Sequence, residues 1–241
     1  MNSQSNRTAG RFATTRWSMV TQFAATQSST ASDALGELAQ RYRYPIYIYI
    51  RRCGHPPAAA EEIARRFLRQ LLGEVSQEVP SRHLRSYLLQ RLHAFLASGR
   101  HENGGDDGVA EHELMPPELE ARYQKEHNDA LSPDQTYQRG FALQVLRRTL
   151  RRLRSEARQT GHLSMYDALE PFLARDPGPG EYEQAASLLR SRPLTLVVAL
   201  KRLRQRFREL GAEELTDTVT TAEDLASEQE ELLRVLGELK T

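Results

Sequence analysis

Residues 182–204 read YEQAASLLRSRPLTLVVALKRLR. Two consecutive alanines starting at Ala185 allow two helices to cross closely, and Pro193 suits the first turn of a second helix. In that second helix Leu196 and Leu200 recur at helical spacing, which places them on one face. A short helix, a brief turn and an arginine-rich helix form helix-turn-helix geometry, although small residues at a crossing occur in any helical hairpin. The two predicted helices span residues 182–189 and 193–210.

The rest of the chain also favours helices. Residues 46–50 alternate Ile and Tyr, which suits a strand by propensity, but the sequence has no second strand-like run for pairing. Residues 132–135 and 221–224 each read as a capping box, which predicts a helix start at both places. The sequence therefore predicts an all-α protein.

Helical periodicity fades between Gly99 and Leu131, where Asn103–Gly108 is rich in Gly and Asp. Such a segment behaves as a pliant linker, so we expect two helical domains on either side of it. The predicted parts are a helical domain at residues 11–99, a flexible linker at 100–131, a helix-turn-helix domain at 132–211 and an acidic C-terminal extension at 212–241.

Charge is segregated along the 241-residue chain although its net charge is only +1. The segment Arg190–Arg208 carries basic charges and no acid, Arg147–Arg158 is nearly as basic, and the segment after Glu213 is acidic. Arginines on helices neutralise nucleic-acid phosphates, whereas the alternative is a solvated face with intrahelical ion pairs. Few acids lie at ion-pair spacing near these arginines, so the pattern favours nucleic-acid binding.

No catalytic constellation stands out, and we expect a non-enzymatic protein without a cofactor. The lone Cys53 excludes an intramolecular disulfide and, with His55, lacks a second pair at zinc spacing, so no metal site is predicted. The adjacent pair Glu61–Glu62 suits the positive end of a helix better than acid–base catalysis. The polar first ten residues contain no apolar segment of a secretory signal, and no apolar run is long enough to span a membrane. The sequence therefore predicts a cytoplasmic protein.

The pentapeptide Thr14–Ser18 reads TTRWS. Together with residues 182–204 and four other segments, it resembles the extracytoplasmic-function type of bacterial RNA polymerase sigma factor, in the longer group that opens with this motif. The segment 182–204 aligns without a gap with the family's helix-turn-helix that reads the −35 element. The other similar segments are residues 34–55, residues 60–72 (like the polymerase-clamp helix), residues 84–97 (like the helix that reads the −10 element) and residues 214–219.

The resemblance implies two all-helical domains, like sigma regions 2 and 4, that bind core RNA polymerase and promoter DNA as a transcription initiation factor. It also allows an anti-sigma or other regulatory protein as a partner. In the first domain the implied −10 contacts are Arg85, Arg91 and His93. In the second domain the implied −35 contacts are Arg192, Thr195, Lys201, Arg202 and Arg204, with Lys201 and Thr195 as the expected base readers and the others on phosphate.

Two departures from the family favour an alternative. The clamp-like helix, where the family is acidic and polar, follows Glu61 and Glu62 with Arg65 and Arg66. The outward face of the second helix-turn-helix helix carries Leu194 and Val198, and an exposed apolar strip is typical of a protein interface. The alternative is a sigma-like regulator that no longer initiates transcription and acts through protein contacts, by dimerisation or by sequestering a partner. These six residues form the predicted polymerase- or partner-binding set.

Overall fold

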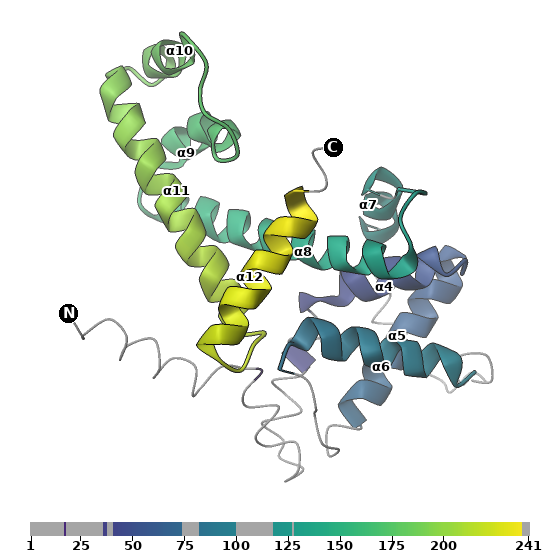
Figure 1. The fold of residues 1–241 in the computed structure, drawn as a ribbon. Helices are drawn as coiled ribbons and strands as arrows, with labels where there is room; N and C mark the ends of the chain where they lie inside the picture. Colours follow the sequence, from purple (N-terminus) through teal and green to yellow (C-terminus); the bar gives the residue numbers. More distant parts are fainter. Residues whose placement is uncertain are drawn as a thin grey trace. The chain divides into compact units, whose positions relative to one another are not determined.

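The computed structural model describes residues 17, 36–37, 41–73, 82–99, 118–126 and 128–237. Helices dominate these residues (Figure 1), and within the described ranges the only β-type pairing is an isolated antiparallel bridge between His83 and Val219. The prediction of an all-helical protein is therefore confirmed for this part of the chain. The helices are α4 (Arg43–Arg52), α5 (Pro57–Gly73), α6 (Leu84–Ala97), α7 (Glu118–Glu126), α8 (Pro133–Gln159), α9 (Leu163–Leu169), the 3-10 helix η2 (Glu170–Phe172), α10 (Glu181–Leu188), α11 (Pro193–Thr216) and α12 (Ala222–Gly237).

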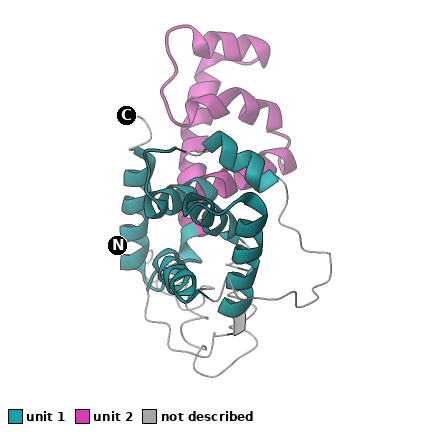
Figure 2. Ribbon diagram, turned by 90° about the vertical axis from the view of Figure 1, so that its right-hand side faces the viewer, with its two compact units in different colours: residues 1–144, 215–241 teal, residues 145–214 magenta. Residues whose placement is uncertain are grey.

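Contacts divide the chain into two compact units (Figure 2). Unit 1 comprises residues 1–144 and 215–241, and unit 2 comprises residues 145–214. This division differs from the predicted one, in which residues 100–131 are a linker and residues 212–241 are a separate extension. The difference arises because α7 forms within the predicted linker and α12 forms within the predicted extension, and both helices belong to unit 1. Residues 100–117 lie outside the described residues.

Helix α4 lies at the centre of unit 1. Every residue from Tyr44 to Ile50 is buried, on all sides of the helix. A helix that is apolar all round requires such an enclosed position, because any exposed face would place Ile or Tyr in water. The helix satisfies its backbone hydrogen bonds internally, so the alternating Ile and Tyr residues need no partner strand. Aromatic contacts extend this core: Tyr42 stacks on Phe141 with ring centroids 4.3 Å apart.

Two carboxylates of α7 bond to α4: Glu126 accepts from the Tyr44 hydroxyl at 2.9 Å, and Glu120 makes the larger set of contacts. Glu120 accepts hydrogen bonds at 2.9 Å from Nε and from Nη2 of Arg51, and the Tyr47 hydroxyl also donates to it. The hydrogen bonds from Arg51 lower the pKa of Glu120 to about 2. The guanidinium of Arg122 lies 3.3 Å from the ring centroid of Tyr44, which adds a cation–π contact between the same two helices.

The segment before α12 is part of the core of unit 1. The backbone N–H of Leu84 donates to the carbonyl of Thr218 at 2.9 Å, and Arg41 donates to the carboxylate of Asp217 at 2.9 Å. Val219 has no exposed surface. These contacts join residues far apart in the sequence, so the C-terminal segment is structural rather than an appended tail.

Both predicted capping boxes are confirmed. At the start of α8 the Gln135 N–H donates to Oγ of Ser132 at 3.2 Å, and the Ser132 N–H donates to the Gln135 side chain at 2.9 Å. At the start of α12 the Asp224 N–H donates to Oγ1 of Thr221, and the Thr221 N–H donates to the Asp224 carboxylate, both at 3.1 Å. Each box satisfies amide groups that the first helical turn leaves unpaired.

Candidate functional site

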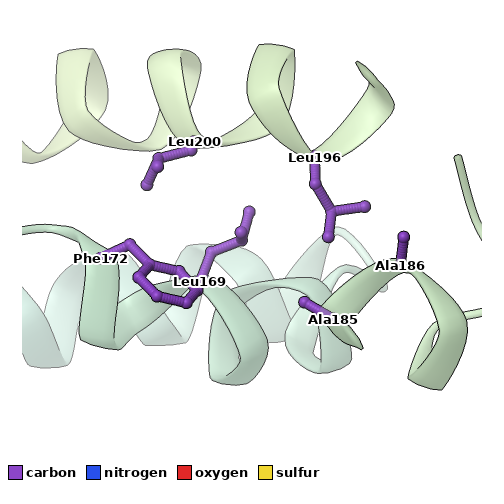
Figure 3. Close-up of a cluster of buried hydrophobic side chains, with 6 residues drawn as sticks. All are labelled: Leu169, Phe172, Ala185, Ala186, Leu196 and Leu200. Carbon is purple, nitrogen blue, oxygen red and sulfur yellow. The ribbon is translucent and has the colours of Figure 1, made fainter. Parts of the chain in front are cut away.

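Helices α10 and α11 of unit 2 follow one another across a short turn and pack against each other. Leu196 and Leu200 point from α11 toward η2, α9 and the two alanines of α10 (Figure 3). Because alanine side chains are short, α10 and α11 can cross closely there. A cluster of buried apolar side chains covers the inner face of α11, and the opposite face of the helix lies outside this core. The buried members are Leu169, Phe172, Ala185, Ala186, Leu196 and Leu200.

The turn between α10 and α11 has an arginine where a glycine is usual. Arg190 has a φ of 49°, in the left-handed region that disfavours residues with a Cβ. The Ser191 N–H donates to the carbonyl of Ala186 at 2.9 Å, and the Arg190 N–H donates to the carbonyl of Ser187 at 3.2 Å. This pair of bonds is a Schellman motif, which ends α10 and redirects the chain into α11.

The outward face of α11 combines aliphatic and basic side chains. The exposed fractions are 73% for Leu194, 42% for Val197 and 46% for Val198. These aliphatic side chains interrupt a polar surface, so the face differs from the uniformly hydrogen-bonding surface expected of a base-reading helix. The polar residues predicted to contact DNA that are exposed on α11 or directly before it are Arg192, Thr195, Lys201 and Arg202.

A groove of about 800 Å³ runs along this part of unit 2, between α11 and the pair α8 and α9. Its lining from α8 and α9 includes Leu153, Ala157 and Met165. Helix α11 contributes Leu194 and Val198 to the opposite wall. Leu194 and Val198, two of the six residues predicted to contact a partner, therefore line a concave surface that is mainly apolar. The polar residues lining the groove are Glu156, Thr160, His162, Arg192, Thr195, Arg202 and Arg206.

Arg204 does not belong to the exposed set, contrary to the expectation of a DNA contact. Its guanidinium donates to the carbonyl of Phe172 at 2.7 Å and 3.1 Å, to the carbonyl of Arg175 at 2.6 Å and to the carboxylate of Asp176 at 2.8 Å. These bonds satisfy the carbonyls at the end of η2 and tie that loop to α11. The side chain is a structural clamp in unit 2.

Several basic residues of α8 and α11 have acidic partners that are remote in sequence. Arg206 forms a bidentate ion pair with Glu156, in which Nη2 donates to Oε1 at 2.7 Å and Nε donates to Oε2 at 2.8 Å. These hydrogen bonds lower the pKa of the Glu156 carboxylate. Arg148 pairs with the buried carboxylate of Glu214, and Arg152 donates to Glu213 at 2.6 Å. Few acidic residues lie at ion-pair spacing near these arginines in the sequence, but the fold brings acidic side chains from other elements to them. These ion pairs neutralise part of the basic charge of α8 and α11.

In unit 1 the predicted −10 contact Arg85 is buried. Its guanidinium donates to both carboxylate oxygens of Glu228 on α12, at 2.8 Å and 3.0 Å, and also donates to Gln138. The Glu228 carboxylate lies 3.1 Å from Nδ1 of His83 and raises the pKa of that imidazole. Burial raises the pKa of Glu228, but His83 and Arg85 outweigh it and the net direction is downward. Arg85 is thus enclosed by α12 rather than presented to a ligand.

The other two predicted −10 residues differ in exposure. His93 is exposed on α6, with Nε2 3.0 Å from the carboxylate of Asp134. Arg91 is half-buried on the same helix. The structure therefore does not bring Arg85 together with them on one open face.

The predicted partner-binding residues on α5 form a local ion-pair set. The Glu62 carboxylate accepts from Arg65 at 2.6 Å and from Arg66 at 2.7 Å, one helical turn further along. Glu61 is half-buried beside them. The arginines that reverse the expected charge of this helix are thus compensated by Glu62, which reduces the positive charge that α5 offers to a partner.

Sequence patterns did not reveal Glu228 or the groove. Arg85 and Glu228 are 143 residues apart, and a glutamate in an acidic helix resembles its exposed neighbours. The groove needs α8, α9 and α11 to converge, which helical periodicity does not specify. The one signal was the apolar pair Leu194 and Val198 on an outward helix face.

No protein-family model matches the chain, and comparison with curated proteins and with solved structures finds no similar protein. Within the described ranges, no three His, Cys, Asp or Glu side chains come together in a way that could hold a metal ion. None of the helices in that part of the chain combines the length and the apolar character that crossing a membrane requires.

Proposed function

We propose that this chain is a sigma-type transcription factor that binds core RNA polymerase and promoter DNA. In this proposal α4, α5 and α6 correspond to sigma region 2, and α10 and α11 correspond to region 4. The observation that carries it is the helix-turn-helix of unit 2, whose second helix exposes Thr195, Lys201 and Arg202, with Arg192 immediately before it. A second helix with exposed donors is the element that enters the major groove in such motifs.

The exposed cations suit phosphate contact. Arg192, Lys201 and Arg202 are exposed and take part in none of the ion pairs found among the described residues, so DNA binding breaks none of those pairs. Thr195 can donate to or accept from a base edge. The aliphatic side chains between them offer at most contact with thymine methyl groups, so we expect phosphate contacts to supply most of the affinity and little of the sequence preference.

The structure of unit 1 limits which of the predicted −10 residues can contact DNA. Because Arg85 is engaged by Glu228, contact with a −10 strand depends on Arg91 and His93 as the structure stands. His93 faces Asp134, whose negative charge opposes a phosphate. The proposal therefore assigns the main share of DNA affinity to α11.

Duplex binding measured by fluorescence anisotropy tests this assignment. The variant carries Lys201→Ala and Arg202→Ala, and the control carries Arg158→Ala together with Arg151→Ala, which removes two exposed charges from α8. We expect the α11 variant to weaken binding and to reduce the slope of log affinity against log salt by about one for each lost phosphate contact, with the control near wild type. Equal losses in the two variants would refute an α11 interface.

A second candidate function is favoured by the exposed side chains of Leu194 and Val198 in the groove. In that case the chain is a sigma-like regulator that acts through protein contacts and no longer initiates transcription. Pull-down with core RNA polymerase, followed by in vitro transcription, separates the two candidates. Polymerase binding with transcript formation supports the first, and absence of both supports the second.

A further inference from the structure

We propose that the groove of unit 2 is a binding site for a small amphipathic organic anion, with an unbranched apolar body and a carboxylate head. The groove lies wholly within unit 2 and is lined by α8, α9, α11 and the loops that precede α9 and α11. Its size, its apolar lining and its arginines each specify one property of the ligand. The inference does not depend on DNA or polymerase binding.

The size of the groove suits a small molecule. Its volume of about 800 Å³ falls within the range of roughly 300–1,000 Å³ that is usual for small-molecule sites. The lining residues of α11 extend from Leu194 to Arg206, which is about 18 Å of helix at a rise of 1.5 Å per residue. A site of this length is better filled by an extended chain than by a compact ring.

The lining calls for an apolar body. Leu194 and Val198 lie on the α11 side, and Ala157 and Met165 come from α8 and α9. Leu194 and Val198 leave 73% and 46% of their surfaces exposed. A hydrocarbon body that covers them removes apolar surface from water on both partners, which is favourable.

Two arginines supply the charge that a carboxylate head needs. Arg192 and Arg202 line the groove and take part in none of the ion pairs found among the described residues. Among the described lining residues Glu156 is the only acidic one, and both of its oxygens already accept from Arg206, at 2.7 Å and 2.8 Å. A guanidinium binds a carboxylate through two parallel hydrogen bonds, so a carboxylate ligand gains ion pairs in this groove.

The same lining discriminates against other small ligands. A cation with the same apolar body would be repelled by Arg192 and Arg202, because Glu156 is already engaged by Arg206. A small anion without an apolar body would leave Leu194 in water. A ligand that has both parts uses the whole lining.

Isothermal titration calorimetry of the full chain with dodecanoate, below its micelle-forming concentration, tests the proposal. Dodecyltrimethylammonium has the same apolar chain with the opposite charge, and acetate has the carboxylate without the chain. We expect one dodecanoate to bind per chain, dodecyltrimethylammonium to bind at least about tenfold more weakly, and acetate to give no binding heat at the same concentrations. Equal binding of the two long-chain ligands, several dodecanoates per chain, or no binding of dodecanoate would overturn the proposal.

Matched charge variants locate the carboxylate head. The groove variant carries Arg192→Gln with Arg202→Gln, which removes two cations from the lining. The control carries Lys201→Gln with Arg208→Gln, which removes two exposed cations of α11 that do not line the groove. We expect the groove variant to bind dodecanoate at least about tenfold more weakly, with the control within about twofold of wild type. Equal losses in the two variants would mean that general positive charge holds the anion, and the site assignment would fail.

A second matched pair locates the apolar body. Leu194→Gln should weaken dodecanoate binding at least about threefold, because it removes apolar surface from the lining. Leu188→Gln is the control, since Leu188 is 85% exposed and does not line the groove. Circular dichroism checks that each variant is folded. Unchanged binding with Leu194→Gln, or an equal loss with Leu188→Gln, would contradict the assignment.

Sedimentation velocity distinguishes this ligand from a second copy of the chain as the occupant. We expect the sedimentation coefficient of the chain to be the same with and without dodecanoate, because the ligand is small and displaces no protein. A dimer that dodecanoate dissociates would mean that the groove is an interface between copies, and this result would overturn the proposal.

Discussion

Replacing Glu228 by Gln should destabilise unit 1 by about 3 kcal/mol at neutral pH. Glu228 has 1% of its surface exposed, and it is the carboxylate that neutralises the buried guanidinium of Arg85. Removing one partner of a buried pair costs about 3–5 kcal/mol because the other charge stays buried without compensation. The lower value is expected here, since a glutamine carbonyl can still accept one hydrogen bond from Arg85.

Urea unfolding followed by tryptophan fluorescence measures this cost. Trp17 is the only tryptophan, has no exposed surface and lies 5.1 Å from the ring of Tyr87, so it reports on unit 1. Glu230→Gln is the matched control on the same helix, because Glu230 is exposed. We expect the control to stay within about 0.5 kcal/mol of wild type.

The pH dependence gives an independent check. The pKa of Glu228 is lowered in the folded chain, so its stabilisation is present above the ordinary glutamate pKa and is lost as the pH falls through the folded value. The pKa of His83 is raised, so its stabilisation is present below its ordinary pKa and is lost as the pH rises through the folded value. The cost of Glu228→Gln should therefore be larger at pH 6 than at pH 9.

Two results would refute this reasoning. The first is a cost of Glu228→Gln below about 1 kcal/mol, which would mean that Arg85 does not depend on this carboxylate. The second comes from the double variant Arg85→Met with Glu228→Gln, which removes both charges and should recover part of the lost stability. A double variant less stable than the sum of the single changes would show that the charges are not coupled as the structure indicates.

Three further predictions concern single residues. Glu120→Gln should remove an acid-dependent part of the stability of unit 1 between pH 4.5 and about 2, because the pKa of Glu120 is lowered over that interval; urea unfolding at several pH values measures it. Arg190→Gly should stabilise unit 2 by about 0.5–1 kcal/mol in thermal unfolding, because glycine tolerates the φ of 49°; a loss of stability would contradict the strained turn. Leu196→Ala should destabilise unit 2 by about 2–5 kcal/mol, since Leu196 has no exposed surface, and the same melting experiment would expose a smaller effect.

Local patterns determined the two capping boxes and the inner face of α11, but not α7, which forms within the predicted linker. The residues at 132–135 and 221–224 act within one helical turn, so their hydrogen bonds follow from spacing alone. The inner face of α11 likewise follows from helical periodicity, which places Leu196 and Leu200 in the core. The helical state of residues 46–50 was predictable from the absence of a partner strand rather than from propensity.

Contacts between residues far apart in the chain could not be predicted from the sequence. Arg85 and Arg204 carry the same guanidinium group as the exposed Arg202, and no local signal in the sequence distinguishes a buried arginine from an exposed one. Tertiary structure decides between them by placing Glu228 beside one and the carbonyl of Phe172 beside the other. The same holds for the groove, whose walls come from three helices.

The sequence by itself determined that the chain is helical, where its capping boxes lie and which side of α11 is apolar, because these depend on neighbours within about one helical turn. Only the tertiary structure decided which arginines remain available to a ligand and that Leu194 and Val198 line a groove. The reason is that a side chain's exposure and ion pairs depend on which distant elements fold against it, and spacing along one helix does not encode that.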